Sequence, residues 1–85
     1  MDLKKNGRFL SEIRKEQGLT QKQLAEQIGV SDKTISKWEC GHGFPDVSMM
    51  MPLCQTLHIS INELVSGERI SANEYLEKAE VTNYK

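Results

Sequence analysis

The stretch that decides the fold runs from residue 20 to residue 39 and reads TQKQLAEQIGVSDKTISKWE. It predicts two short helices separated by a tight corner at Gly29, because glycine tolerates the positive φ that such a corner requires. Thr20 and Gln23 have the spacing of a capping box at the start of the first helix. Ser31 is a good N-cap residue for the second helix. Two short helices joined in this way are typical of a helix-turn-helix unit, whose second helix enters the major groove of DNA.

The side chains of this unit separate into an inward and an outward set. The inward set recurs at helical spacing and consists of Leu24, Ala25, Ile28, Ile35 and Trp38, with Val30 filling the turn. The outward set lies on the second helix and is polar: Asp32, Lys33, Thr34, Ser36 and Lys37. A helix with such a face has no apolar surface left for a further helix, so the face suits either water or the edges of bases.

Another helix is expected before the unit, from about Lys5 to Gln17. Phe9, Leu10 and Ile13 form its inward stripe. Gly18 supplies its stop, since glycine commonly follows the last residue of a helix.

Two more helices are expected after the unit. Asp46 is placed to cap the first of them, whose apolar residues are Met49, Met50, Leu53 and Leu57. Pro52 inside that helix predicts an irregular first turn rather than a break. Ser60 and Glu63 then form a second capping box, which opens a short helix that contains Ile61, Leu64 and Val65 and ends at Gly67.

We therefore expect an all-α fold: a five-helix DNA-binding domain over residues 5–66, with its helix-turn-helix motif at 20–39, and an acidic helical tail or linker at 67–85. Ser71 and Glu74 repeat the capping spacing, and a short polar helix with Tyr75, Leu76 and Ala79 follows them. A dimer contact, a docking helix and a frayed end are all compatible with this tail.

The composition of the 85 residues fits one small domain. No apolar run approaches the roughly 18 residues that a membrane helix requires, and no hydrophobic signal segment follows Met1, so we expect a cytoplasmic protein without membrane contact. The net charge is −1. Residues 1–44 hold eight Lys and Arg against six Asp and Glu, whereas residues 45–85 hold three against six. The positive excess thus accompanies the helix-turn-helix.

The sequence resembles the Cro/lambda-repressor-like (XRE-type) helix-turn-helix family of bacterial and phage transcriptional regulators. The residues that carry the resemblance are Gly18-Leu19-Thr20-Gln21, Leu24-Ala25, Ile28-Gly29-Val30-Ser31, Ile35-Ser36-Lys37-Trp38-Glu39, Leu57-His58-Ile59-Ser60 and Glu63-Leu64. The resemblance covers roughly residues 9 to 65. It implies a five-helix lambda-repressor-like domain that binds double-stranded operator DNA, commonly as a homodimer on a pseudo-palindromic site.

The resemblance also implies roles for particular residues. Gln21 corresponds to a position that bonds a phosphate, and Asp32, Lys33 and Lys37 to positions that reach base edges. Backbone or secondary contacts are implied for Ser31, Thr34 and Ser36. Arg14 and Glu39 resemble a structural ion pair between the first helix and the end of the third.

Physical chemistry supports most of these roles. Lysine donates to guanine O6 and N7, although without the fork of arginine. Gln21 lies at a helix N-terminus, where the dipole favours phosphate. For Asp32 two interpretations stay open: acceptance of a hydrogen bond from cytosine N4, and stabilisation of the helix dipole.

Other patterns compete with this hypothesis. Cys40, His42, Cys54 and His58 suggest zinc, but their spacing is not that of a usual finger, so we expect no metal and no cofactor. Trp38 is in register with Ile35, which favours the core over stacking on a base. The run Met49-Met50-Met51 is compatible with a partner surface and with core filling, the latter being commoner for Met49 and Met50.

The sequence therefore predicts a sequence-specific transcriptional regulator, and within this family repression is the commoner mode. The alternative is a protein-interaction module, such as an antitoxin or adaptor, on the same fold. We expect no enzyme, because no activated nucleophile, phosphate loop or carboxylate pair is present.

Overall fold

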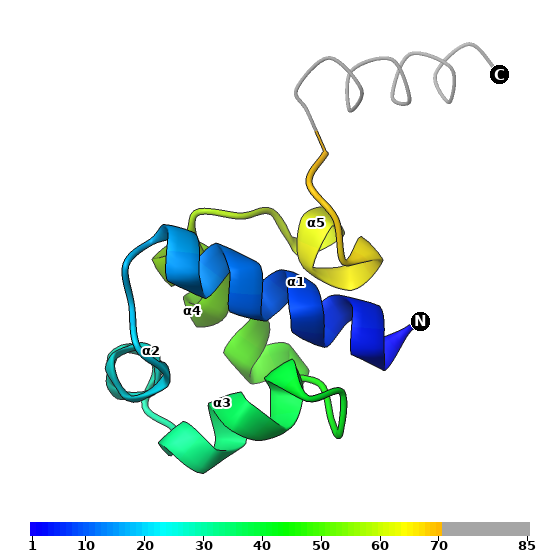
Figure 1. The fold of residues 1–85 in the computed structure, drawn as a ribbon. Coiled ribbons are helices and arrows are strands. Elements are labelled where there is room, and N and C mark those ends of the chain that lie inside the picture. The colour runs from blue at the N-terminus through cyan, green and yellow to red at the C-terminus, as the bar shows by residue number, and fades with distance from the viewer. Residues whose placement is uncertain (71–85) are drawn as a thin grey trace, which may run out of the picture.

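The computed structural model describes residues 1–70, which form five helices and contain no strand. The helices are α1 (Leu3–Glu16), α2 (Gln21–Ile28), α3 (Asp32–Glu39), α4 (Val47–Leu57) and α5 (Ile61–Ser66). Figure 1 shows that α1 lies between α3 on one side and α5 on the other. The expectation of an all-α, five-helix domain is confirmed, whereas the helix expected around Tyr75, Leu76 and Ala79 lies outside the described residues.

The helix ends form where the capping residues predict them. Thr20 and Gln23 make a reciprocal capping box at α2, as Ser60 and Glu63 do at α5. Ser31 accepts from Thr34 N at the start of α3, and Asp46 accepts from Met49 N at the start of α4. Gly29 ends α2 with φ +81°, and Gly67 ends α5 with φ +72°. These caps satisfy backbone groups that a short helix would otherwise leave to water.

Two details of the helices differ from the expectation. α1 begins at Leu3 rather than Lys5, because the side chain of Asp2 accepts a hydrogen bond from Lys5 N and starts the helix earlier. α4 is α-helical from Val47 onward and holds Pro52 in its interior, so the expected irregular first turn is wrong while the absence of a break is confirmed. Pro52 is the sixth residue of α4 and lies beyond the first turn. Because proline has no backbone N–H, the helix lacks the one hydrogen bond that residue 52 would donate to the carbonyl oxygen of Ser48.

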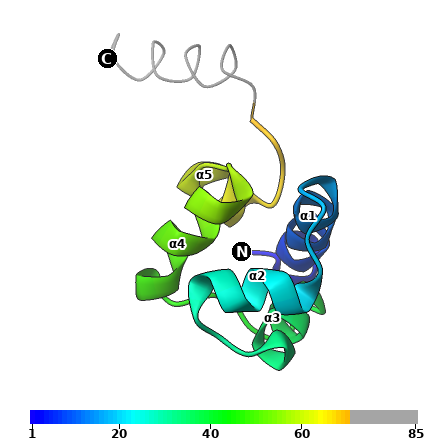
Figure 2. The ribbon, with the colours of Figure 1, turned by 90° about the vertical axis from the view of Figure 1, so that its left-hand side faces the viewer.

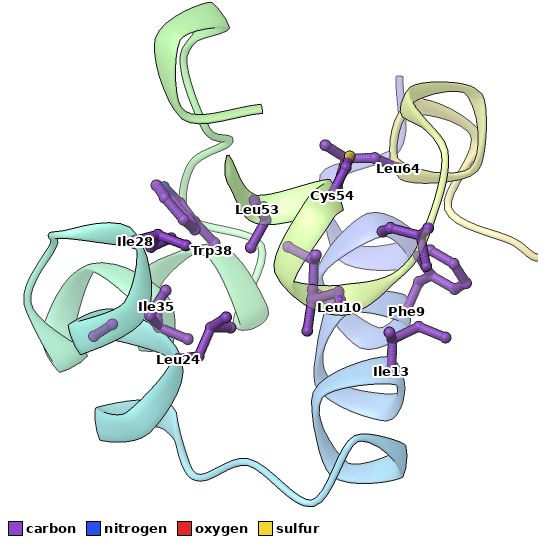
Figure 3. Packing of buried hydrophobic residues seen from close by; sticks show 13 residues of the cluster. Phe9, Leu10, Ile13, Leu24, Ile28, Ile35, Trp38, Leu53, Cys54 and Leu64 are labelled. Carbon is purple, nitrogen blue, oxygen red and sulfur yellow. The ribbon is translucent and has the colours of Figure 1, made fainter. Parts of the chain in front are cut away.

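The core is one cluster of thirteen buried residues drawn from every helix. Eleven of its residues lie on the apolar faces that the sequence predicts: Phe9, Leu10, Ile13, Leu24, Ala25, Ile28, Ile35, Trp38, Leu53, Leu57 and Leu64. Val30, Met49, Met50 and Ile61 are partly buried and pack against it. In Figure 3, α4 carries Leu53 toward Ile28 and Trp38, and Cys54 toward Leu64. α4 therefore connects the α2–α3 half of the core with the α1–α5 half.

A close crossing joins α1 to the end of α3. A Cβ atom on Gly7 would lie 2.5 Å from the carbonyl oxygen of Glu39 and 2.6 Å from that of Trp38. Only a residue without a side chain allows the two backbones to approach this closely. Gly7 therefore sets how deeply the C-terminal end of α3 sits against α1.

A buried amide attaches α5 to α1. Asn6 is 1% exposed, and its Nδ2 donates to Leu64 O and to Val65 O, both at 2.9 Å. These two carbonyls lie at the end of α5, where no helical partner is available to them. After α5, Lys5 pairs with Glu68, and Arg69 pairs with Glu16, so that the segment following Gly67 contacts α1.

Candidate nucleic-acid interface

α3 is presented at the edge of the domain. Its inner face is held by Ile35, which is 1% exposed, and by Trp38, which is 7% exposed. Figures 1 and 2 show α3 at the opposite side of the domain from α5, with α2 beside it and no other helix of residues 1–70 over its outer face. Burial of Trp38 agrees with its expected place in the core.

The two lysines of α3 extend from this outer face. Lys33 and Lys37 are both exposed. Within residues 1–70 neither of them takes part in an ion pair or a side-chain hydrogen bond. The stem of Lys37 passes Gly43 in the loop after α3, since a Cβ on Gly43 would lie 3.5 Å from Lys37 Cε. Both ammonium groups are therefore available to an external acceptor.

The remaining polar residues of α3 differ in how free they are. Ser31 and Asp32 are exposed, whereas Thr34 and Ser36 are half-buried. The hydroxyl oxygens of Ser31 and Thr34 lie 3.0 Å apart and share a hydrogen bond, and Ser31 Oγ also accepts from Thr34 N. These two hydroxyls thus stabilise the first turn of α3, where Asp32 adds a negative charge.

A buried ion pair connects the end of α3 with α1. Arg14 Nε donates to Glu39 Oε2 at 2.7 Å, and Arg14 Nη2 donates to Glu39 Oε1 at 3.0 Å. The third donor group of Arg14, Nη1, reaches Leu19 O at 2.8 Å. The structure thus contains the ion pair that the family resemblance implied, in the bidentate geometry that makes such pairs strong.

Gln21 belongs to the same network. It is half-buried at the first position of α2, and its Nε2 donates to Glu39 Oε1 at 3.1 Å. One carboxylate therefore joins α1, α2 and α3. The contact of Gln21 with a phosphate stays a prediction, but the structure places its amide between α2 and the end of α3.

The helix N-termini near α3 differ in charge. α2 and α3 are capped by the neutral residues Thr20 and Ser31. α4 is capped by Asp46. The pKa of this carboxyl is lowered chiefly by the hydroxyl of Ser48; desolvation opposes the shift, and hydrogen bonds from backbone N–H groups add to it. A carboxylate at α4 already compensates the positive end of that helix dipole, whereas the end of α2 remains open to an anion.

The residues suggested as metal ligands do not gather. Within residues 1–70 no three His, Cys, Asp or Glu side chains lie close enough to hold a metal ion. Cys54 is buried in the core and Cys40 is exposed, and both thiols are free. Cys54 thus packs as a small apolar residue, as its place between Leu53 and Leu57 indicated.

Two residues that position α1 against α5 and α3 were not identified from the sequence. Asn6 and Gly7 lie within α1 and were given no role. A signal was present, since Asn6 stands three and seven residues before Phe9 and Ile13, on the apolar stripe itself. A polar residue on such a stripe indicates a buried hydrogen bond, and a glycine inside a helix indicates close packing or a functional constraint.

The fold and this site together define a helix-turn-helix domain. A family model described as Helix-turn-helix matches residues 10–64. The chain belongs to the Cro/lambda-repressor-like (XRE-type) family of helix-turn-helix transcriptional regulators. None of the helices in residues 1–70 is long and apolar enough to cross a membrane.

Two curated relatives support this assignment. The chain is 43% identical over 61 residues to the HTH-type transcriptional activator BcrR of Enterococcus faecalis, covering 72% of this chain and 30% of BcrR. It is 34% identical over 67 residues to the cryptic phage CTXphi transcriptional repressor RstR of Vibrio cholerae, covering 79% of this chain and 60% of RstR. The chain thus spans less than two thirds of either relative.

Solved structures agree with the fold. The restriction-modification controller protein C.AhdI of Aeromonas hydrophila superimposes with a TM-score of 0.68 at 32% identity, over 74% of this chain and 96% of that one. The clp gene regulator ClgR of Corynebacterium glutamicum superimposes with a TM-score of 0.71 at 21% identity, over 99% of this chain and 87% of that one. The second likeness concerns the fold alone.

Proposed function

We propose that the chain is a sequence-specific DNA-binding regulator that places α3 in the major groove of an operator and represses transcription by occupying it. The observation that carries this proposal is the outer face of α3, where Lys33 and Lys37 are exposed and unpaired within residues 1–70. The family of the chain and the regulators to which it is similar support the same function. Binding alone produces the effect, with no chemical step and no cofactor.

The proposed contacts follow the geometry of the unit. Lys33 and Lys37 donate to base edges in the groove. Gln21 donates to a phosphate at the N-terminus of α2, where the neutral cap leaves the helix dipole uncompensated. Ser31, Thr34 and Ser36 contribute backbone or secondary contacts beside them.

Asp32 has two candidate roles that one substitution separates. If Asp32 accepts from cytosine, Asp32→Asn lowers affinity for the preferred site and relaxes the choice of base at one position. If Asp32 only stabilises the dipole of α3, Asp32→Asn raises affinity for every duplex by removing a charge near the phosphates and lowers stability by about 0.3 to 1 kcal/mol.

We propose further that two copies bind together on a pseudo-palindromic site. Val47 is 81% exposed, Met51 56% and Val65 41%, so α4 and α5 offer apolar surface outside the core. A two-fold symmetric protein mirrors a two-fold symmetric operator, with half-sites about one helical turn apart. A single half-site recovered at random spacing would contradict this part of the proposal.

Selection of preferred sites from a random DNA pool tests the function. The wild-type chain should enrich one half-site, with affinity that falls steeply as salt rises. Lys37→Ala should weaken binding to the enriched site by roughly 5-fold to 150-fold if it reads a base. Arg69→Ala is the matched control, because it removes one exposed charge in the segment that follows α5.

Two outcomes would overturn the proposal. One is a pool that yields no enriched site, and the other is binding of Lys33→Ala and Lys37→Ala to every duplex with wild-type affinity. Gel filtration then distinguishes the alternative, a protein-interaction module, which predicts a stable protein complex and only weak affinity for random-sequence DNA.

A further inference from the structure

The carboxylate of Glu39 accepts hydrogen bonds from two other elements at once. Oε2 accepts from Arg14 Nε at 2.7 Å, and Oε1 accepts from Arg14 Nη2 at 3.0 Å and from Gln21 Nε2 at 3.1 Å. Only 6% of the Glu39 side chain is exposed. The two-point contact with the guanidinium leaves the carboxylate no freedom to rotate, so its outer lone pair has a fixed direction.

This arrangement decides which way round the Gln21 amide lies. A carboxylate paired with a guanidinium only accepts hydrogen bonds, so the NH2 group of Gln21, rather than its carbonyl oxygen, faces Glu39. An NH2 group has two N–H bonds, and Glu39 takes one of them. The second N–H belongs to an atom that is already held in place, at the first residue of α2.

We propose that Glu39 is a positioning residue for DNA binding: held by Arg14, it orients the Gln21 amide so that the second N–H donates to a phosphate oxygen of the operator. The inference rests on the proposed function and names a residue that itself touches no DNA. Its physical basis is preorganisation. A glutamine side chain that is already ordered in the free protein loses less conformational entropy on binding than a mobile one.

A purely structural role for Glu39 predicts something different. In that case the carboxylate only holds α1 against α3, and Gln21 finds its phosphate without help. The two roles diverge at a single phosphate, because only the positioning role makes the energy of that one contact depend on Glu39.

The test uses duplexes of the selected site in which one phosphate at a time is replaced by a neutral methylphosphonate. For the wild-type chain, one replacement beside the N-terminus of α2 should weaken binding about tenfold, as expected for a hydrogen bond to a charged group. Gln21→Ala should reduce that effect to about twofold or less at the same phosphate, and should leave the effects at other phosphates unchanged.

The decisive variant replaces the ion pair and keeps Gln21. In the double variant Arg14→Met, Glu39→Met the pair gives way to apolar side chains of similar length, a change that proteins often tolerate. The sensitivity at the same phosphate should fall to about twofold although Gln21 is present. Full retention of the tenfold effect in a folded double variant would overturn the proposal.

A measurement on the unaltered protein covers the case in which the double variant does not fold. Nitrogen-15 relaxation of side-chain amides should show Gln21 as rigid as the backbone of α2, whereas the exposed Gln27 of the same helix should be mobile. Equal mobility of the two amides would contradict the inference. If the wild type binds no duplex at all, the proposed function fails, and this outcome is distinct from a failure of the positioning role.

Discussion

Gly7→Ala sets two effects of opposite sign against each other. In an ordinary helix interior, alanine is more favourable than glycine by roughly 0.5 to 1 kcal/mol. At Gly7 the new methyl group would lie 2.5 Å from the carbonyl oxygen of Glu39, 2.6 Å from that of Trp38 and 2.8 Å from the carbonyl carbon of Glu39. All three atoms belong to the backbone of α3, so no side-chain rotation relieves the clash.

The magnitude follows from the displacement that is required. To lengthen the 2.5 Å contact to an ordinary 3.4 Å, α1 and the end of α3 must separate by about 0.9 Å. Such a separation loosens the packing of Trp38 and stretches the Arg14–Glu39 contact. Overpacking of this kind costs about 1 to 3 kcal/mol, and the rigid backbone neighbours place Gly7→Ala at the upper end. After the gain in helix propensity, we expect a net loss of about 2 kcal/mol.

Urea and thermal unfolding followed by circular dichroism measure this loss. For a domain of this size a loss of about 2 kcal/mol lowers Tm by about 8 to 16 °C. Gln27→Ala, at an exposed position in α2, is the control and should change the free energy of unfolding by no more than about 0.5 kcal/mol. A Gly7→Ala protein that melts at or above the wild-type temperature would refute the crossing argument.

Three further outcomes follow from buried or partly buried groups. Asn6→Ala should lower the free energy of unfolding in urea by about 2 to 3 kcal/mol, because two carbonyls at the end of α5 lose their donor, whereas the exposed Asn62→Ala should change it little. Burial alone would raise the pKa of Glu63, but hydrogen bonds from two backbone N–H groups and a hydroxyl lower it on balance. The ionised carboxylate therefore stabilises the fold above the unfolded pKa of about 4.5, and this contribution is lost as the pH falls through the lower folded pKa. In the Glu63→Gln variant, the free energy of unfolding should accordingly decline less steeply below about pH 5 than in the wild type. Burial, with the nearby carboxylate of Glu63, raises the pKa of the Cys54 thiol. A thiol reagent should therefore modify the exposed Cys40 quickly and the buried Cys54 only at the rate of unfolding. Fast modification of both thiols would show that the core around Cys54 opens readily.

Local patterns predicted most of the fold. The N-caps Thr20, Ser31, Asp46 and Ser60 all act at the helix starts that they indicated. Capping depends on residues three or four apart, and apolar stripes repeat within one helix, so both are visible in a short window of sequence. The same local character explains why the buried face of α3 was predicted correctly.

Features that depend on contacts between distant segments were less accessible. The amide of Asn6 reaches carbonyls 58 and 59 residues away, and Gly7 faces the end of α3. Neither partner can be identified without knowing how α1 crosses the other helices. His58 also escaped prediction, since it ends α4 in the left-handed conformation at φ 57°, where glycine is usual.

For the site, the sequence identified the residues but only part of their connections. The outward set on α3 and the Arg14–Glu39 pair followed from helical register and from the family resemblance. The hydrogen bond from Gln21 to Glu39 joins the first residue of α2 to the last residue of α3. Such a bond depends on the angle between the two helices, which the spacing of residues alone does not specify.

The charges of the N-caps relate these local choices to function. α1 and α4 begin with the carboxylates of Asp2 and Asp46, and the pKa of Asp2 is lowered chiefly by the backbone N–H of Lys5. α2, α3 and α5 begin with the neutral hydroxyls of Thr20, Ser31 and Ser60; the first turn of α3 also carries Asp32 and that of α5 carries Glu63, whereas the first turn of α2 carries no acidic residue. A carboxylate cap gives a helix more stability than a hydroxyl does when the helix end faces water, because it also interacts with the dipole. At a helix end that must approach phosphate the same charge would repel the ligand, so a neutral cap gives up some stability in the free protein and retains the attraction. Under the proposed function, α2 is the helix in which this exchange favours binding, because among the hydroxyl-capped helices of residues 1–70 it is the one without a carboxylate in its first turn.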